Sequence, residues 1–431
     1  MRIEDLYRLF QQTKGVCTDS RKAGSGSIFF ALRGENFNGN DYALQALENG
    51  CALAVVDEKP GKHDERIIVV PDVLQHLQEM ARFHRRKMNL PVIGITGSNG
   101  KTTTKELIKQ ILGTKFTVTS TRGNLNNHIG VPLTVLDINE ATDIAVIEMG
   151  ANHVGEIDLL SGISMPTHGI ITNIGNAHLE GFGSPGMVIR AKNELYEYLR
   201  QNGGEVFVNC DDPLLMELTC DLKRTTFGKL PEAGMIARDT SEVFSSLEWK
   251  IPHQVSEWQK VSTKLVGSYN FYNVVSAIAV GHYFGIDHRL INQSLAEFEP
   301  GPNRSQYTET ADNRLIMDAY NANPDSMKAA LQNFAGMKSG NKVVILGDMF
   351  ELGEFSQAAH QEIVRELEES ELEEVYLVGE EFYKQSGTSC FRFFPDLDSF
   401  INYLEGHQLK GKLILLKGSR GMKLERLADY L

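Results

Sequence analysis

The segment ITGSNGKTTTKE at 95–106 constrains the fold more than any other part of the chain. A short apolar run, PVIGI at 91–95, leads into a glycine-rich turn, and KTTTKELIKQIL at 101–112 then puts its aliphatic side chains on one helical face. A strand, a glycine-rich turn and a helix in this order are typical of a phosphate-binding loop in an α/β sheet. Glycines let backbone N–H groups converge on a polyphosphate, and the helix N-terminus adds partial positive charge.

The side chains of this loop predict binding of a nucleoside triphosphate. Lys101 supplies a cation for the β- and γ-phosphates, and the Thr102 hydroxyl is placed to bind Mg²⁺. The usual pattern has a further glycine where this chain has Ile95, so the loop is a shortened variant. The alternative, a glycine-rich turn with an incidental lysine, is disfavoured by the ordered succession of strand, turn, lysine and helix. The predicted phosphate-binding residues are Gly97, Ser98, Asn99, Gly100, Lys101 and Thr102.

Apolar runs along the rest of the chain predict an α/β protein of three domains. Residues 1–88 form a small N-terminal α/β domain, and residues 89–300 form a central parallel-sheet domain of the ATPase type. Residues 301–431 form a C-terminal Rossmann-like domain, in which strand-like runs alternate with helices that begin near 324, 355, 396 and 421. We interpret residues 235–266, which lack helical periodicity, as a small antiparallel appendage.

Charge and composition exclude several classes of partner. The formal net charge of −13 opposes non-specific nucleic-acid binding, and no run of lysine and arginine offsets it. No apolar run approaches the roughly 20 residues that cross a bilayer, and the acidic start differs from a signal peptide. The five scattered cysteines include no C-x-x-C pair. We therefore expect a cytoplasmic protein with no nucleic-acid or membrane partner.

Two residues near expected strand ends are candidate metal ligands. Glu148 ends the apolar run at 143–149, beside the predicted loop, where a carboxylate can hold Mg²⁺. His178 follows another such run, although a lone histidine is more often structural, and the nearby Glu180 is a second ligand or a surface charge. Lys192, in a predicted helix, looks like an ordinary surface lysine.

Several further motifs together resemble the Mur ligases, which are ATP-dependent amide-forming enzymes of bacterial peptidoglycan assembly. Besides the loop, the resemblance rests on IEMGA (147–151), TNIGNAHLEGFGS (172–184), AKNEL (191–195) and GSYNFYNVVSA (267–277). In the C-terminal segment, DAYNANPDSM (318–327), LGDMFELGEFSQAAH (346–360) and LLKGSRGMKLE (415–425) are similar to the member that adds D-alanyl-D-alanine to UDP-N-acetylmuramoyl-tripeptide. The resemblance implies a monomeric bacterial enzyme that works through an acyl phosphate.

The resemblance also implies a role for particular residues of this chain. Lys101, Lys192, His178 and Arg304 are the implied catalytic residues, with Lys192 carbamylated by CO₂. Implied ligands of two Mg²⁺ ions are Thr102, Glu148, His178 and the modified Lys192. ATP would contact the loop from Gly97 to Thr103 together with Asn270, Asn273 and Asp318. The implied substrate contacts are Ser20, Arg21, Asn124, Asn126, Asn127, Asn321, Asn323 and Arg420, with Lys417 closing on the site.

Some questions remain open at this point. GPNRSQ at 301–306 has an asparagine directly before Arg304, where many relatives have glycine. His360 and Asp348 are alternative bases for the attacking amine, or are both structural. The other functions considered are a folylpolyglutamate synthase, a Mur ligase that adds a different amino acid, and a non-catalytic nucleotide switch. The third residue of the peptide, lysine or diaminopimelate, is left undecided.

Overall fold

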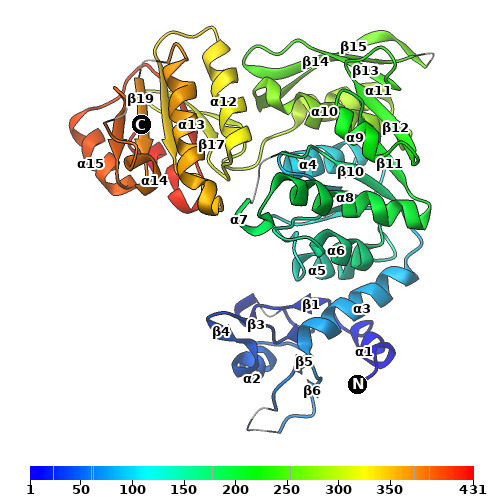
Figure 1. The fold of residues 1–431 in the computed structure, drawn as a ribbon. Helices are drawn as coiled ribbons and strands as arrows, with labels where there is room; N and C mark the ends of the chain where they lie inside the picture. Colours follow the sequence, from blue (N-terminus) through cyan, green and yellow to red (C-terminus); the bar gives the residue numbers. More distant parts are fainter. Residues whose placement is uncertain are drawn as a thin grey trace.

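Three α/β units follow one another along the chain, each built on its own main sheet (Figure 1). The computed structural model describes residues 1–22, 24–59, 61, 63–175, 179–252, 254–372, 374–387 and 389–431. The expected fold class, α/β with a central parallel sheet and a Rossmann-like C-terminal unit, is confirmed. None of the helices within these ranges is long and apolar enough to cross a bilayer.

The N-terminal unit is a parallel sheet in the order β1-β2-β5-β6, with a small β3–β4 hairpin beside it. Its long helix α3 starts at an Asp72 cap and packs on helices α5 and α6 of the central unit, so one apolar core joins the two units. The bounds are β1 Val16–Cys17, β2 Ile28–Phe30, β3 Arg33–Gly34, β4 Phe37–Asn38, β5 Leu53–Val56, β6 Ile67–Val69, α1 Ile3–Phe10, α2 Ala43–Glu48 and α3 Val73–Lys87.

The central unit is a nine-stranded sheet in the order β15-β14-β13-β12-β11-β10-β7-β9-β8. Strands from β8 to β13 are parallel, and β14 and β15 continue the sheet in antiparallel fashion. The expected appendage at 235–266 is therefore antiparallel in part, but it is an extension of the main sheet, because β13 pairs with β12. The strands are β7 Val92–Thr96, β8 Val118–Ser120, β9 Ile144–Glu148, β10 His168–Ile171, β11 Glu205–Asn209, β12 Lys223–Gly228, β13 Met235–Asp239, β14 Phe244–Ile251 and β15 Val255–Val266.

Helices cover both faces of this sheet. One face carries α4, α10 and α11, and the other carries α5, α6 and α8, since alternate residues of β7 and β9 contribute to two different apolar clusters. The helices are α4 Lys101–Leu112, α5 Gly130–Leu136, α6 Glu156–Ser164, α7 Leu179–Phe182, α8 Pro185–Asn202, α9 Pro213–Leu218, α10 Phe271–Tyr283 and α11 His288–Glu297.

The C-terminal unit is a six-stranded sheet in the order β16-β17-β21-β18-β19-β20, parallel except for β16. The helix expected to begin near 421 is instead two 3₁₀ turns, Arg420–Met422 and Leu424–Asp429, because Lys423 between them has a left-handed φ of 54°. The bounds are β16 Gln306–Glu309, β17 Arg314–Asp318, β18 Lys342–Gly347, β19 Glu374–Val378, β20 Arg392–Phe394, β21 Leu413–Lys417, α12 Pro324–Gly336, α13 Ser356–Glu368, α14 Glu380–Tyr383 and α15 Leu397–Gly406.

Candidate functional site

A cavity of about 850 Å³ lies between the central and C-terminal units. The loops that follow β7, β9 and β10 line it from one side, and the loops that follow β17 and β21 line it from the other. Because parallel strands end at one edge of their sheet, both units present chemically active side chains to the same space. Predicted residues that line it are Ser98 to Thr103, Asn124, Asn126, Asn127, Glu148, Asn270, Asn273, Arg304, Asp318, Asn321, Lys417 and Arg420.

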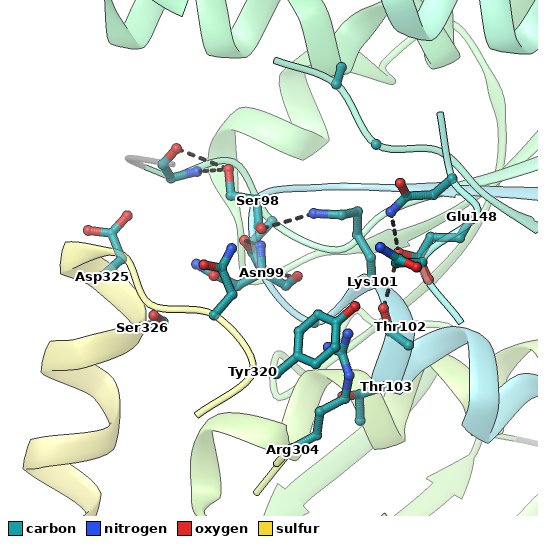
Figure 2. A pocket seen from close by; sticks show the side chains of 18 of the residues that line it. Ser98, Asn99, Lys101, Thr102, Thr103, Glu148, Arg304, Tyr320, Asp325 and Ser326 are labelled. Carbon is teal, nitrogen blue, oxygen red and sulfur yellow. Dashed lines mark hydrogen bonds between the residues drawn. The ribbon is translucent and has the colours of Figure 1, made fainter. Parts of the chain in front are cut away.

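The phosphate loop has the backbone that its glycines predict. Gly97 and Gly100 have φ values of 143° and 80°, and a Cβ at Gly100 would lie 2.3 Å from Asn273 Oδ1. Lys101 Nζ donates to the carbonyl oxygens of Gly97 at 2.7 Å and Ser98 at 3.1 Å (Figure 2). The lysine thus lies over its own loop, where it can exchange carbonyl oxygens for phosphate oxygens.

Asn270 and Asn273, expected to contact ATP, form a buried amide network under this loop. Asn273 Nδ2 donates to Asn270 Oδ1 at 3.0 Å, and the Thr104 hydroxyl donates to Asn273 Oδ1 at 3.1 Å. Asn270 Nδ2 in turn donates to the carbonyl of Val266 at 2.9 Å. These contacts tie α10 to α4, so both asparagines support the loop whatever else they bind.

Glu148 is the buried carboxylate of the site. Its Oε1 accepts from the Thr102 hydroxyl at 3.1 Å and from Asn126 Nδ2 at 2.8 Å. Its Oε2 is buried without a hydrogen bond, and Lys105 Nζ stands 3.8 Å away, beyond hydrogen-bonding reach. The Thr102 hydroxyl and the Glu148 carboxylate, which includes the unsatisfied Oε2, are hard oxygen donors of the kind that suits Mg²⁺. The residues present therefore fit this ion.

A nucleotide-bound Mg²⁺ needs few protein ligands, because phosphate oxygens and water complete its shell. The described ranges contain no group of three or more His, Cys, Asp and Glu side chains that could hold an ion by themselves. His178, the second ligand expected from the sequence, lies outside the described residues. Glu180 is exposed, and its backbone N–H donates to the carbonyl of Glu351 at 3.3 Å.

Lys192, which looked like a surface lysine, is buried in α8 and only 1% exposed. Its Nζ donates to the carbonyl of Ala151, which lines the cavity, at a long 3.4 Å, and lies 5.2 Å from the Phe182 ring. Burial, helped by the nearby charge of Lys101, lowers the pKa of Lys192 to about 7. A substantial share of this amine is therefore neutral and nucleophilic near neutral pH.

The C-terminal unit contributes cations and a direct link to the loop. Lys417 Nζ donates to Asp318 Oδ2 at 2.6 Å, and Arg304 stacks on the ring of Tyr320. Asn323 caps α12 by accepting from Ser326 N at 2.9 Å. Its Nδ2 also donates to Asn99 Oδ1 at 2.8 Å, so the cap of a C-terminal helix touches the phosphate loop.

Ser20 and Arg21 lie elsewhere, in the N-terminal unit. Ser20 is buried, with its carbonyl accepting from Asn49 Nδ2 at 3.0 Å, and the exposed Arg21 pairs with Asp19 at 2.9 Å. The structure does not bring them into the cavity.

His360 and Asp348, the candidate bases, have structural partners instead. His360 Nδ1 donates to the carbonyl of Ser356 at 2.7 Å, and its Nε2 accepts from Met349 N at 3.1 Å. Asp348 accepts from the backbone N–H groups of Glu381 and Phe382 at 2.9 and 3.0 Å. Neither side chain lines the cavity beside the phosphate loop.

Lys105 and Tyr320 are among the residues at the site that the sequence did not predict. Lys105 is fully buried behind Glu148, and its Nζ donates to the carbonyl of Thr121 at 2.7 Å. The sequence did indicate that Lys105 is buried, because the helical period at 101–112 places it on the buried face near Ile108. Tyr320 had no such signal, since its contact with Arg304 depends on how distant loops meet.

Comparison with known proteins follows the same division into three units. Family models match residues 12–85 as "Mur ligase family, catalytic domain", 95–281 as "Mur ligase middle domain" and 303–420 as "Mur ligase, glutamate ligase domain". The UDP-N-acetylmuramoyl-tripeptide--D-alanyl-D-alanine ligase of Bacillus subtilis is 36% identical over 98% of this chain and 94% of its own length. The chain is also similar to MurF from Acinetobacter baumannii, with a TM-score of 0.88, 32% identity and coverage of 99% and 98% of the two chains. For MurF from Thermotoga maritima in complex with ADP, the TM-score is 0.84 at 27% identity, covering 97% of each chain.

Proposed function

Since the chain belongs to the Mur ligase family, we propose that it is an ATP-dependent ligase that joins D-alanyl-D-alanine to UDP-N-acetylmuramoyl-tripeptide. The product is the UDP-linked pentapeptide used to build peptidoglycan. The observation that carries the proposal is a cavity into which a phosphate loop and the C-terminal sheet both open. The similarity to ligases of this name over nearly the whole chain supports the choice of substrates.

The chemistry requires the peptide carboxylate to be activated, since its oxygens are poor leaving groups. Transfer of the γ-phosphoryl group to the carboxylate gives an acyl phosphate, whose phosphate an amine can displace. Both reactants of the first step are anions, and Lys101 and Arg304 offset their repulsion. The free amine of the dipeptide then attacks the acyl carbon, and phosphate leaves from the tetrahedral intermediate.

Mg²⁺ would be held by Glu148 and Thr102, and it supplies charge stabilisation for the transferred phosphoryl group. For Lys192 we propose carbamylation by CO₂, which converts a buried amine into an anion beside the metal site. The support is its burial, its weak hydrogen bond and a pKa near 7, which leave a neutral amine that can attack CO₂. Two Mg²⁺ ions are consistent with these added carboxylate oxygens.

For the remaining contacts, we propose that Ser20 and Arg21 of the N-terminal unit bind the uridine nucleotide, and that Asn124, Asn126 and Asn127 bind the sugar diphosphate. Asn321, Asn323 and Arg420 are proposed to contact the dipeptide. We also propose that the chain acts as a cytoplasmic monomer, because its five cysteines are free thiols and one chain supplies every unit of the cavity.

Mass spectrometry of the product tests this function. The chain is incubated with ATP, Mg²⁺, D-alanyl-D-alanine and UDP-N-acetylmuramoyl-tripeptide carrying either lysine or diaminopimelate. We expect a pentapeptide with one of the two, release of phosphate that depends on the acceptor, and loss of both in Lys101→Ala because the phosphate loop loses its cation. Product from single amino acids, or from folate and glutamate, would instead favour the other ligases, and acceptor-independent hydrolysis would indicate a nucleotide switch.

A further inference from the structure

Two guanidinium groups gather on one aromatic ring at the wall of the cavity. The guanidinium carbon of Arg304 lies 3.5 Å from the centre of the Tyr320 ring, and that of Arg420 lies 5.3 Å from it. Figure 2 shows Arg304 against this ring, close to Thr103 at the start of α4. The three side chains come from separate segments: the one before β16, and the loops that follow β17 and β21. Contacts of this kind within about 6 Å are attractive, and more so away from water.

The backbone that carries Arg304 is held in an unusual conformation. Asn303 and Ser305, on either side of it, have φ values of 59° and 50°, in the left-handed region. The strand and loop that carry Tyr320 fix both neighbours, because Tyr320 N donates to the Asn303 carbonyl at 3.1 Å and Ser305 N donates to Asp318 Oδ1 at 3.2 Å. Strained residues persist only where their surroundings over-determine them. The Tyr320 segment therefore holds Arg304 by both backbone and ring.

The ring leaves the charge of these arginines available. Lys417 is neutralised by Asp318, and Lys101 is hydrogen-bonded to its own loop. Within the described ranges, no carboxylate lies within ion-pairing distance of Arg304 or Arg420, and the Tyr320 ring is their common neighbour. A carboxylate would cancel a positive charge, whereas an aromatic face attracts a cation and carries no net charge. The arrangement keeps two cations together for an incoming anion.

The ring also lines two cavities. A second cavity of about 730 Å³ shares Thr102, Thr103, Arg304, Tyr320 and Arg420 with the first. Both arginines and the ring thus line both cavities. Resting on the proposed function, we propose that Tyr320 is a positioning residue, whose ring holds Arg304 and Arg420 as an uncompensated cationic pair for the anionic groups of ATP and of the dipeptide.

Steady-state kinetics of four proteins test this role: the wild type, Tyr320→Leu, Tyr320→Phe, and Tyr430→Leu as a matched control at an exposed tyrosine of the same unit. We expect Tyr320→Leu to lower kcat/KM for ATP and for D-alanyl-D-alanine by about tenfold, which lies between the size of an exposed and a desolvated cation–π contact. The KM for the UDP-linked tripeptide, whose nucleotide binds the remote N-terminal unit, should change by less than about twofold. Tyr320→Phe keeps the ring face and should recover most of the loss.

A double-mutant cycle with Arg420→Gln gives an independent measure. If the ring acts through the arginine, Arg420→Gln should cost less in the Tyr320→Leu background than in the wild type. Additive losses, equal losses in the Phe and Leu variants, or unaltered kinetics in Tyr320→Leu would each overturn the proposal. Should Tyr320→Leu fail to fold, Tyr320→Gln takes its place. A wild type that makes no pentapeptide would instead refute the proposed function.

Discussion

At the scale of single residues, the conformation of Asn303 explains how an asparagine can stand before Arg304, where the family resemblance led us to expect glycine. Its φ of 59° lies in the left-handed region, which glycine adopts freely and asparagine tolerates better than other side chains. The Asn303 side chain makes no hydrogen bond with the described residues, so its contribution is conformational. The departure therefore preserves the backbone geometry that presents Arg304.

The left-handed φ of Asn303 predicts the stability of two variants. Asn303→Ala should destabilise the C-terminal unit by about 1 kcal/mol, because alanine is strained at positive φ. Asn303→Gly should stay within about 0.5 kcal/mol of the wild type. Urea unfolding followed by circular dichroism measures both, and an alanine variant as stable as the glycine variant would contradict the explanation.

Lys192 gives a second prediction at this scale. Lys192→Ala should lose nearly all ligation, because the proposed carbamate is removed, and it should also lower the thermal midpoint, because a large buried side chain is lost. Acetate or formate should restore part of the activity by standing in for the missing carboxylate. An independent readout is the carbamate signal in nuclear magnetic resonance with isotopically labelled bicarbonate, expected in the wild type and missing in the variant. Unimpaired turnover without additive would remove Lys192 from the site.

At the scale of elements, the local spacing of apolar residues was sufficient to predict a helix or strand where the whole element repeats one pattern. The helix expected at 101–112 has those bounds in the structure, and strands were expected at the places of β7, β9 and β17. Edge strands such as β16, with sequence QYTE, were not predicted, because a half-exposed strand has no apolar run. The continuity of β13 with β12 and the contacts of Lys105 and Tyr320 depend on pairing between distant segments, which no local pattern encodes.

The packing of α1 on α3 predicts how stability depends on pH. His84 in α3 is buried, and its Nε2 must donate to the carbonyl of Ile138 at 2.7 Å, because a carbonyl only accepts. Its Nδ1 then accepts from the Tyr7 hydroxyl of α1 at 3.0 Å. Burial lowers the pKa of His84 below 6.5, so the folded state favours the neutral ring.

The sign of the effect follows from this pKa. Below pH 6.5 the unfolded chain takes up a proton that the folded chain still excludes, so stability is present above that pH and falls as the pH drops. Urea unfolding between about pH 7.5 and 5.5 should show a loss that is larger in the wild type than in His84→Gln, by on the order of 1 kcal/mol. Equal losses in the two proteins would contradict this role for His84.

At the scale of the whole molecule, the first two units share a core, while the third meets the central unit across a cavity. Helix α3 packs on α5 and α6 through apolar side chains, which fixes the N-terminal unit to the central one. The hydrogen bonds between Asn323 and Asn99 instead join the C-terminal unit to the phosphate loop at 2.8 and 3.5 Å. A ligase that admits three substrates and then excludes water needs a joint of this kind, which closes the C-terminal unit on the phosphate loop.

The hydrogen bonds between Asn99 and Asn323 should hold the C-terminal unit close to the phosphate loop. A hydrogen bond contributes about 1 kcal/mol net, so its removal should shift the ratio of closed to open molecules by about fivefold towards the open form. Asn99→Ala removes the bond from one side, and Asn323→Ser removes it from the other while keeping a good cap for α12. Both should increase the radius of gyration in small-angle X-ray scattering, whereas Asn202→Ala, at the exposed end of α8, should not. If the two variants scatter like the wild type, the apolar and remaining polar contacts between the units set their orientation, and the phosphate loop does not take part in it.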